Sequence, residues 1–150
     1  MRLGKFQNPE TVRNRFYRSP NGWLAARGIT PAGPPIIRYL TCDMPKGLDI
    51  EVGFPVADVL TGDMRVLSGV SPEGRYAVMT YSGPYDNDGL VKATAALLEW
   101  AQENHITWQT SIMNGSEWWR ARSEVYLTDP HMEPDPEKWQ TELVFLTVDA

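Results

Sequence analysis

Glu124 and Tyr126 carry the side chains of this sequence best suited to bind or transform a small molecule. They are two residues apart in a stretch typical of a β-strand, so their side chains should face the same side. Trp118 and Trp119 come just before them, after a turn-like Asn-Gly-Ser. A carboxylate ringed by aromatic side chains suits a lipophilic cation. Each ring can add about 0.5–2 kcal/mol of cation–π attraction, and the carboxylate supplies a counter-charge.

Two other interpretations of these residues stay open. Glu124 can form a surface ion pair with Arg120 or Arg122, in which case the two tryptophans belong to the core. Alternatively, a buried glutamate can have a raised pKa and act as a general acid or base. The first interpretation gives a structural site and the second a catalytic one.

Other kinds of site have little support in the sequence. His105, His131 and the single cysteine, Cys42, lie in different segments without metal-ligand spacing. The sequence contains no nucleophile-elbow, phosphate-loop or dinucleotide-binding fingerprint. We therefore expect neither a metal nor a cofactor. A lone cysteine also excludes an intrachain disulfide and favours the reducing cytoplasm.

Length and charge narrow the class further. The 150 residues fit one domain, 1–150, and the net charge of -5 argues against direct nucleic-acid binding. No apolar run approaches the roughly 20 residues that a membrane helix needs. We expect a stand-alone cytoplasmic domain, without a DNA-binding module or a membrane partner, whose acidic field attracts cations.

The two halves of the chain, about residues 1–60 and 61–150, follow one plan. Residues 38–43 resemble residues 125–130, and residues 50–56 resemble residues 141–147, in the same order and at similar spacing. This alignment puts Tyr39 in the place of Tyr126, on the corresponding face of its own strand. Tyr39 therefore joins the candidate site.

The second half predicts a β-α-β-β unit. Residues 75–82 are typical of a strand, and the turn signal before them would pair it with residues 64–70 as a hairpin. Asn87 or Asp88 can cap a helix over residues 89–104. Strands near residues 123–128 and 141–148 complete the unit.

The first half repeats the plan less fully. A helix capped by Asn8 should run from Pro9 to about Arg27, interrupted at Pro20, before paired strands over residues 36–41 and 48–55. Residues 4–6 align with residues 83–85, which leaves almost nothing for the strand that should come first. An unpaired sheet edge invites a second chain, so we expect a possible homodimer.

Three stretches of the chain together resemble a known family. Residues 49–56 are similar to the strand signature of GyrI-like, or AraC effector-binding, domains, a group that includes SOUL-like and BmrR C-terminal-like domains. Residues 70–77 with Gly83-Pro84-Tyr85 resemble the family's central hairpin and turn, and residues 123–130 with 139–142 its closing segment. The resemblance implies an α+β fold. Two pseudo-symmetric β-α-β-β modules would form a curved antiparallel sheet, with a helix per module and a central ligand cleft.

The resemblance also implies what the chain does. Relatives include drug-sensing domains of transcription regulators, free-standing drug-binding proteins, gyrase-modulating proteins and hydrolases of cyclopropane-bearing antibiotics. It places a ligand-contacting acid near Glu124. We therefore expect a multidrug-type protein that captures bulky hydrophobic molecules, often cationic or planar aromatic. The expected ligand-binding residues are Tyr39, Trp118, Trp119, Glu124 and Tyr126.

Two alternatives remain. A cyclopropanoid hydrolase would use Glu124 to orient water and Tyr126 or Tyr39 to donate a hydrogen bond, with Glu51 or Glu142 as the next candidate acids. A gyrase-interacting modulator, or the partner of a separate regulator, would act through a protein surface.

Overall fold

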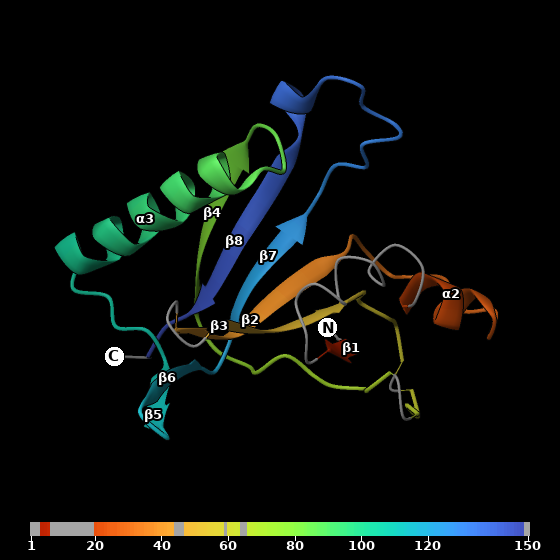
Figure 1. Cartoon of the computed structure of the whole chain (residues 1–150), viewed down its shortest axis with the longest axis horizontal. Helices are drawn as coiled ribbons and strands as arrows, with labels where there is room; N and C mark the ends of the chain where they lie inside the picture. Colours follow the sequence, from red (N-terminus) through yellow and green to blue (C-terminus); the bar gives the residue numbers. More distant parts are fainter. Residues whose placement is uncertain (1–3, 7–19, 44–46, 59, 64–65, 149–150) are drawn as a thin grey trace.

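The structure is a computed structural model that describes residues 4–6, 20–43, 47–58, 60–63 and 66–148. Figure 1 shows a curved antiparallel sheet with the long helix α3 lying over one side of its second half. The strands are β1 (Gly4–Phe6), β2 (Ile36–Asp43), β3 (Gly47–Gly53), β4 (Tyr76–Ser82), β5 (Thr110–Met113), β6 (Ser116–Trp119), β7 (Arg122–Tyr126) and β8 (Gln140–Leu146). The helices are α2 (Pro20–Ala25), α3 (Asn87–Glu103) and the 3-10 turn η1 (Pro136–Lys138).

The sheet confirms the predicted α+β fold and its pseudo-symmetry. The strand order is β1-β3-β2-β7-β8-β4, so each half contributes three strands in mirrored order, and β2 pairs with β7 in the middle. This central pairing is the predicted contact between the Tyr39 and Tyr126 strands. Because each half needs the other to complete the sheet, residues of both halves meet at its centre.

The strand register confirms the alignment of the later strands of each half. Ile37 lies opposite Glu124, so a twofold through this pair relates Tyr39 to Tyr126. Tyr39 lies opposite Ile50 on β3, and Tyr126 lies opposite Thr141 on β8. Residues 50–56 therefore correspond to residues 141–147, as the sequence suggested.

The alignment of the first strand was wrong. Phe6 of β1 lies opposite Ile50, and Tyr81 of β4 lies opposite Thr141. Phe6 therefore corresponds to Tyr81, not to Tyr85, and residues 4–6 are the short strand that was expected to be missing. Three residues carry too little pattern to distinguish a strand from a turn. The open edge expected beside β3 is occupied by β1 along residues 50–52.

In the second half, the predicted strand and helix form, but two details differ. The strand over residues 75–82 is β4, which pairs with β8 rather than with residues 64–70. The described residues 66–70 form no strand, so the predicted hairpin was wrong. The cap of α3 is Asp86, whose side chain accepts a hydrogen bond from the Gly89 N–H, rather than Asn87 or Asp88.

A β5–β6 hairpin, which was not predicted from the sequence, precedes β7 in the chain. Its turn residues, Asn114 and Gly115, both have positive φ (52° and 75°), the backbone that a two-residue hairpin turn requires. β6 also touches the first half, because Trp118 lies opposite Thr41 of β2. The hairpin thus extends the contact between the two halves.

The main core lies between α3 and the sheet. Apolar α3 residues at helical spacing pack onto β4 and β8, and Trp119 closes the end of this cluster. The buried members are Ala77, Ala93, Leu97, Trp119, Leu143 and Phe145. The opposite face of the sheet carries a smaller cluster of Ile36 and Val125. On the side of the sheet that faces α3, the helix covers only the second half, so the centre of the sheet lies beside the helix rather than under it.

The region of α2 contacts the loop after β3 through polar side chains. The predicted helix from Pro9 lies mostly outside the described residues, and α2 is its described part. The Trp23 indole N–H donates to Asp63 at 2.6 Å, and the Arg27 guanidinium lies 3.6 Å from the Trp23 ring centroid. Among the described residues, no helix is long and apolar enough to cross a membrane.

Candidate functional site

The candidate site centres on Glu124, in the middle strand β7. Its side chain is only 7% exposed, between Ile37 of β2 and Leu143 of β8. Leu143 belongs to the core under α3, so Glu124 is on the helix-covered side of the sheet. Strand alternation puts Tyr126 on the same side, and its hydroxyl donates a hydrogen bond to Glu124 Oε2. The two side chains therefore face the same side, as their spacing predicts.

Tyr39 completes a three-residue cluster across the central strands. Its hydroxyl also hydrogen-bonds to the Glu124 carboxylate. Burial, and then the negative charge of Glu124, raise the pKa of Tyr39 and that of Tyr126 far above the usual range of a tyrosine. Both hydroxyls therefore remain protonated donors. The two halves of the protein supply one tyrosine each to the same carboxylate.

The charge of Glu124 is opposed by burial and favoured by its neighbours. Burial raises the pKa of Glu124 above its ordinary value. The hydrogen bonds from Tyr126 and Tyr39, and the positive charge of Arg122, lower that pKa by a smaller amount. The Glu124 carboxyl group therefore keeps its proton to a higher pH than a solvated carboxyl group does.

Arg122 lies inside the aromatic cluster rather than on the surface. Its guanidinium carbon is 4.7 Å from the Trp119 ring centroid, 4.8 Å from that of Phe145 and 5.8 Å from that of Tyr39. Its Nε is buried without a hydrogen-bond partner among the described residues. Sequence reasoning treated Arg122 only as a possible surface partner of Glu124. The alternation of β7 was the signal that could have placed it beside Glu124.

The two tryptophans of the predicted site point in different directions. Trp119 is 7% exposed and packs in the core, with ring centroids 5.7 Å from Phe145 and 5.9 Å from Trp108. Trp118 is half-buried, and as the preceding residue of β6 it faces the other side of that strand. Trp119 reaches the Glu124 cluster through Arg122.

Tyr85 and Trp139 are aromatic neighbours that were absent from the predicted site. The Tyr85 ring meets Tyr126 edge-on at 5.0 Å between centroids and lies 4.9 Å from Trp139. The Tyr85 hydroxyl donates to the carbonyl of Thr128 at 2.7 Å and accepts from its N–H at 3.0 Å. Both residues stand in the stretches that resemble the family, which was the available signal.

Glu51 and Glu142, the next candidate acids after Glu124, are on the opposite face of the sheet. Glu142 lies opposite Val125, and Glu51 lies opposite Arg38, with which it forms an ion pair at 3.3 Å. Glu142 is adjacent to Leu143, which pairs with Glu124, and Glu51 is adjacent to Ile50, which pairs with Tyr39. Successive residues of a strand point to opposite faces, so both carboxylates lie across the sheet from Glu124.

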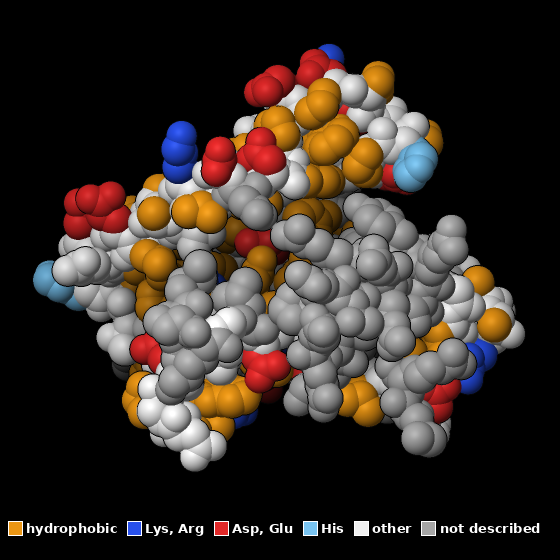
Figure 2. Space-filling model, in the orientation of Figure 1, with side chains coloured by type: hydrophobic (Ala, Val, Ile, Leu, Met, Phe, Trp, Pro, Cys, Tyr) orange, Lys and Arg blue, Asp and Glu red, His pale blue; other side chains and the backbone are white. Residues whose placement is uncertain are grey.

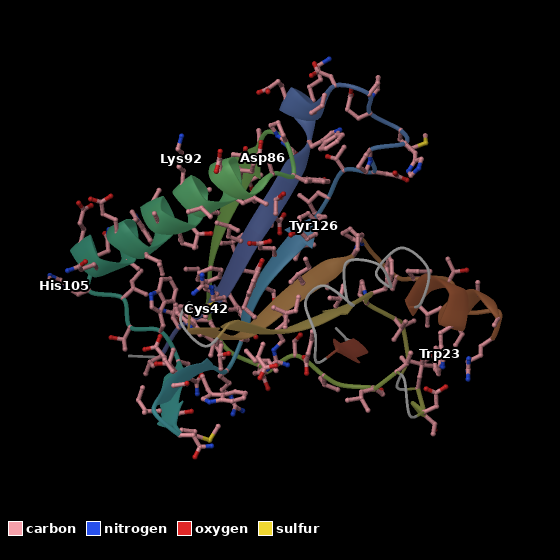
Figure 3. The ribbon with its side chains drawn as sticks, in the orientation of Figure 1. Trp23, Cys42, Asp86, Lys92, His105 and Tyr126 are labelled. Carbon is pink, nitrogen blue, oxygen red and sulfur yellow. The ribbon has the colours of Figure 1, made fainter. Side chains whose placement is uncertain are left out.

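Figure 2 shows a recess beside the α3 half of the molecule, and its floor is formed by hydrophobic side chains with an acidic one among them. Figure 3 shows Tyr126 at the end of β7, pointing into this region between α3 and β2. The Thr141 hydroxyl, opposite Tyr126, is fully buried without a partner among the described residues. A few polar groups in an apolar recess suit an organic ligand.

Comparisons with solved structures agree on the fold. The chain is similar to the crystal structure of the EcmrR C-terminal domain, with 20% identity, a TM-score of 0.65, and coverage of 100% of this chain and 88% of that one. It resembles EcmrR in the cryo-EM structure of the EcmrR-DNA complex in EcmrR-RPo, with 21% identity, a TM-score of 0.69, and 99% coverage of this chain but only 53% of that one. An uncharacterized conserved protein from Listeria innocua gives 16% identity and a TM-score of 0.64, over 98% of this chain and 86% of that one.

The comparison with protein families is more specific than these structural likenesses. A search of curated proteins found no match. The family described as the GyrI-like small molecule binding domain matches residues 15–146, which include both central strands and all three members of the Glu124 cluster. This chain therefore belongs to the GyrI-like small molecule binding domain family.

Proposed function

We propose that this protein binds bulky hydrophobic small molecules in the recess above Glu124, and prefers those that carry a positive charge. The single observation behind this proposal is the buried carboxylate at the junction of the two halves, with one tyrosine hydroxyl from each half bonded to it. A ligand that reaches this carboxylate meets Tyr39, Tyr126 and the rings around them.

The preference for cations follows from the balance at Glu124. Burial disfavours the bare carboxylate, and the neighbouring Arg122 and the two hydroxyls offset this only in part. A lipophilic cation would bring a second positive charge without requiring the carboxylate to return to water. The rings of Tyr126, Tyr85 and Trp139 would provide apolar contact and cation–π attraction on one side.

The test compares two ligands of the same shape. Fluorescence titrations would measure the affinity of a rhodamine-like cation and of its neutral analogue for the wild type and for Glu124→Gln. We expect the variant to bind the cation at least about tenfold more weakly, a change of about 1.4 kcal/mol, and the neutral analogue nearly as well. An equal loss for both ligands would remove the role of the charge.

Glu142→Gln is the matched control. It removes the same charge from the adjacent register position on the opposite face of the sheet, and so should leave both affinities unchanged. If neither ligand binds the wild type while the protein recovers gyrase from an extract, the gyrase-modulator alternative would replace the binding proposal.

A second candidate, hydrolysis of a cyclopropane-bearing antibiotic, is favoured by the raised pKa of Glu124 beside two protonated tyrosines. Glu124 would orient a water molecule whose oxygen bonds to a ring carbon. As the cyclopropane carbon–carbon bond breaks, the conjugated carbonyl oxygen takes up the electrons of that bond and the proton that the water gives up, and becomes a phenol. Excess duocarmycin-type compound distinguishes the two functions: a hydrolase releases more than one equivalent of hydrated product, and a binder releases none.

A further inference from the structure

Among the described strands, none pairs with the outer side of β4, which is therefore an edge of the sheet. β4 pairs with β8 through seven consecutive residue pairs without a register shift, and β8 covers only one of its sides. Its sequence, YAVMTYS, contains no charged residue and no proline. Natural sheets usually protect an exposed edge with charges, prolines or bulges, because an exposed strand can pair with another chain. The absence of all three in β4 indicates that this edge has a partner.

The backbone groups available on this edge can be identified from the hydrogen bonds at the two ends of β4. The Gly83 N–H donates to Trp139, and the Arg75 carbonyl accepts from Thr147, so odd-numbered residues bond to β8. Antiparallel pairing alternates, so the even-numbered residues direct their N–H and C=O groups outward. These residues are Tyr76, Val78, Thr80 and Ser82. No hydrogen bond within the described part of the chain uses these outward groups.

The flank of α3 above this edge carries an exposed aromatic side chain. Gly89 lies against the Tyr81 ring of β4, since a Cβ added there would fall within 2 Å of the Tyr81 hydroxyl. Ala96 and Trp100 follow Gly89 by seven and eleven residues, which places them on the same flank of the helix. Trp100 is 46% exposed there. Figure 1 shows the C-terminal half of α3 extending outward beyond β4.

Charges along α3 favour a second copy of this chain over an unrelated partner. Asp88 and Lys92 lie in the N-terminal half of α3, and Glu99 and Glu103 lie in the C-terminal half, all exposed. If two copies of α3 lie antiparallel, Lys92 of each copy faces the acidic end of the other. An antiparallel self-association therefore brings Lys92 and the acidic end of α3 together twice, once in each direction.

We infer that β4 is the interface of a homodimer, in which it pairs antiparallel with β4 of a second copy. With Met79 at the twofold axis, Val78 lies opposite Thr80 of the partner subunit, and all four outward-facing residues of β4 pair. The two α3 helices then lie on the same side of one continuous sheet, with Trp100 of each copy at the contact. This inference does not depend on what the recess binds.

Light scattering after size-exclusion chromatography tests the inference. The wild type should have twice the 16.9 kDa mass of the chain. Val78→Lys puts a charge at the middle of the edge, and should reduce the mass to that of a monomer with an unchanged circular dichroism spectrum. Ile112→Lys is the matched control, because Ile112 is an aliphatic residue with 69% exposure on the β5–β6 hairpin. This variant should remain dimeric.

Amide hydrogen exchange shows which surface is used, and does not depend on how the variants fold. In the wild type, the outward amides of Val78 and Thr80 should exchange as slowly as the inward amides of Ala77 and Met79. In Val78→Lys, the outward amides alone should become fast. A wild-type monomer, a dimer that survives Val78→Lys, or a dimer with fast outward amides would each overturn the inference.

Discussion

Glu124 is held out of water while two tyrosine hydroxyls bond to its carboxylate. The hydrogen bonds from the tyrosines stabilise the ionised carboxylate, but burial still raises its pKa above the ordinary value of 4.5. The folded protein therefore binds more protons than the unfolded chain at pH values between the unfolded and the folded pKa. Over that window, stability decreases as the pH rises.

Glu124→Gln should consequently make the protein more stable at neutral pH while weakening cation binding. The free energy of unfolding should increase by about 1.4 kcal/mol for each unit by which the fold raises the pKa of Glu124. This gain should shrink as the pH falls, and be lost below pH 4.5, the unfolded value, where the wild-type carboxyl is protonated in both states. Urea denaturation at a series of pH values measures it, and a gain that does not vary with pH would contradict this account.

The site was predictable where it depended on strand alternation, and not where it depended on side-chain packing. Two-residue spacing was enough to pair Glu124 with Tyr126, and the internal repeat was enough to add Tyr39. Arg122 obeys the same alternation, but an arginine is so often solvated that its place among aromatic rings could not be read from spacing. Trp118 and Trp119 are adjacent, so alternation alone could have separated them.

At the scale of elements, α3 defines one wall of the recess, and its start depends on a single side chain. Asp86 accepts a hydrogen bond from the Gly89 N–H at 2.9 Å and caps the helix. Helix caps of this kind contribute about 1 kcal/mol, with a range of roughly 0.5–2.

Asp86→Ala should lower the free energy of unfolding by about 1 kcal/mol, because the first turn of α3 loses its acceptor. Asp88→Ala is the matched control. It removes an equivalent charge from the first turn without removing the cap, and should cost only about 0.3 kcal/mol, the low end of the effect of an exposed charge on the helix dipole. Thermal or urea unfolding followed by circular dichroism distinguishes the two, and equal losses would mean that charge rather than the cap stabilises the helix.

Elements with long patterns were predicted and short ones were not. The apolar periodicity of α3 and the alternation of β4 extend over enough residues to identify both. The β5–β6 hairpin has strands of only four residues, and its Asn-Gly turn was noticed without its strands. The hairpin proposed for residues 64–70 followed from a real turn signal, but β8 provided the better partner for β4. Competition between distant strands cannot be seen in a local pattern.

At the scale of the whole molecule, fewer residue pairs join the strands of the two halves than join neighbouring strands within either half. β2 forms seven residue pairs with β3, and β4 forms seven with β8. Between the halves, β2 forms three pairs with β7 and one with β6. Tyr39 and Glu124 meet at this narrow junction, so an occupant of the recess would touch both halves.

The narrow junction has a consequence for how the protein unfolds. We expect the half that contains β2 and β3 to open at a lower free energy than the whole molecule, as a separate cooperative unit. Cys42, the single cysteine, is in β2 and can report this opening through its rate of thiol labelling. Five of the six tryptophans are in the other half, so tryptophan fluorescence reports the unfolding of that half. In dilute urea, labelling should give a smaller free energy than fluorescence, and a saturating ligand that bridges Tyr39 and Glu124 should bring the two values together. Identical values without ligand would mean that the junction, narrow as it is, already makes the chain a single folding unit.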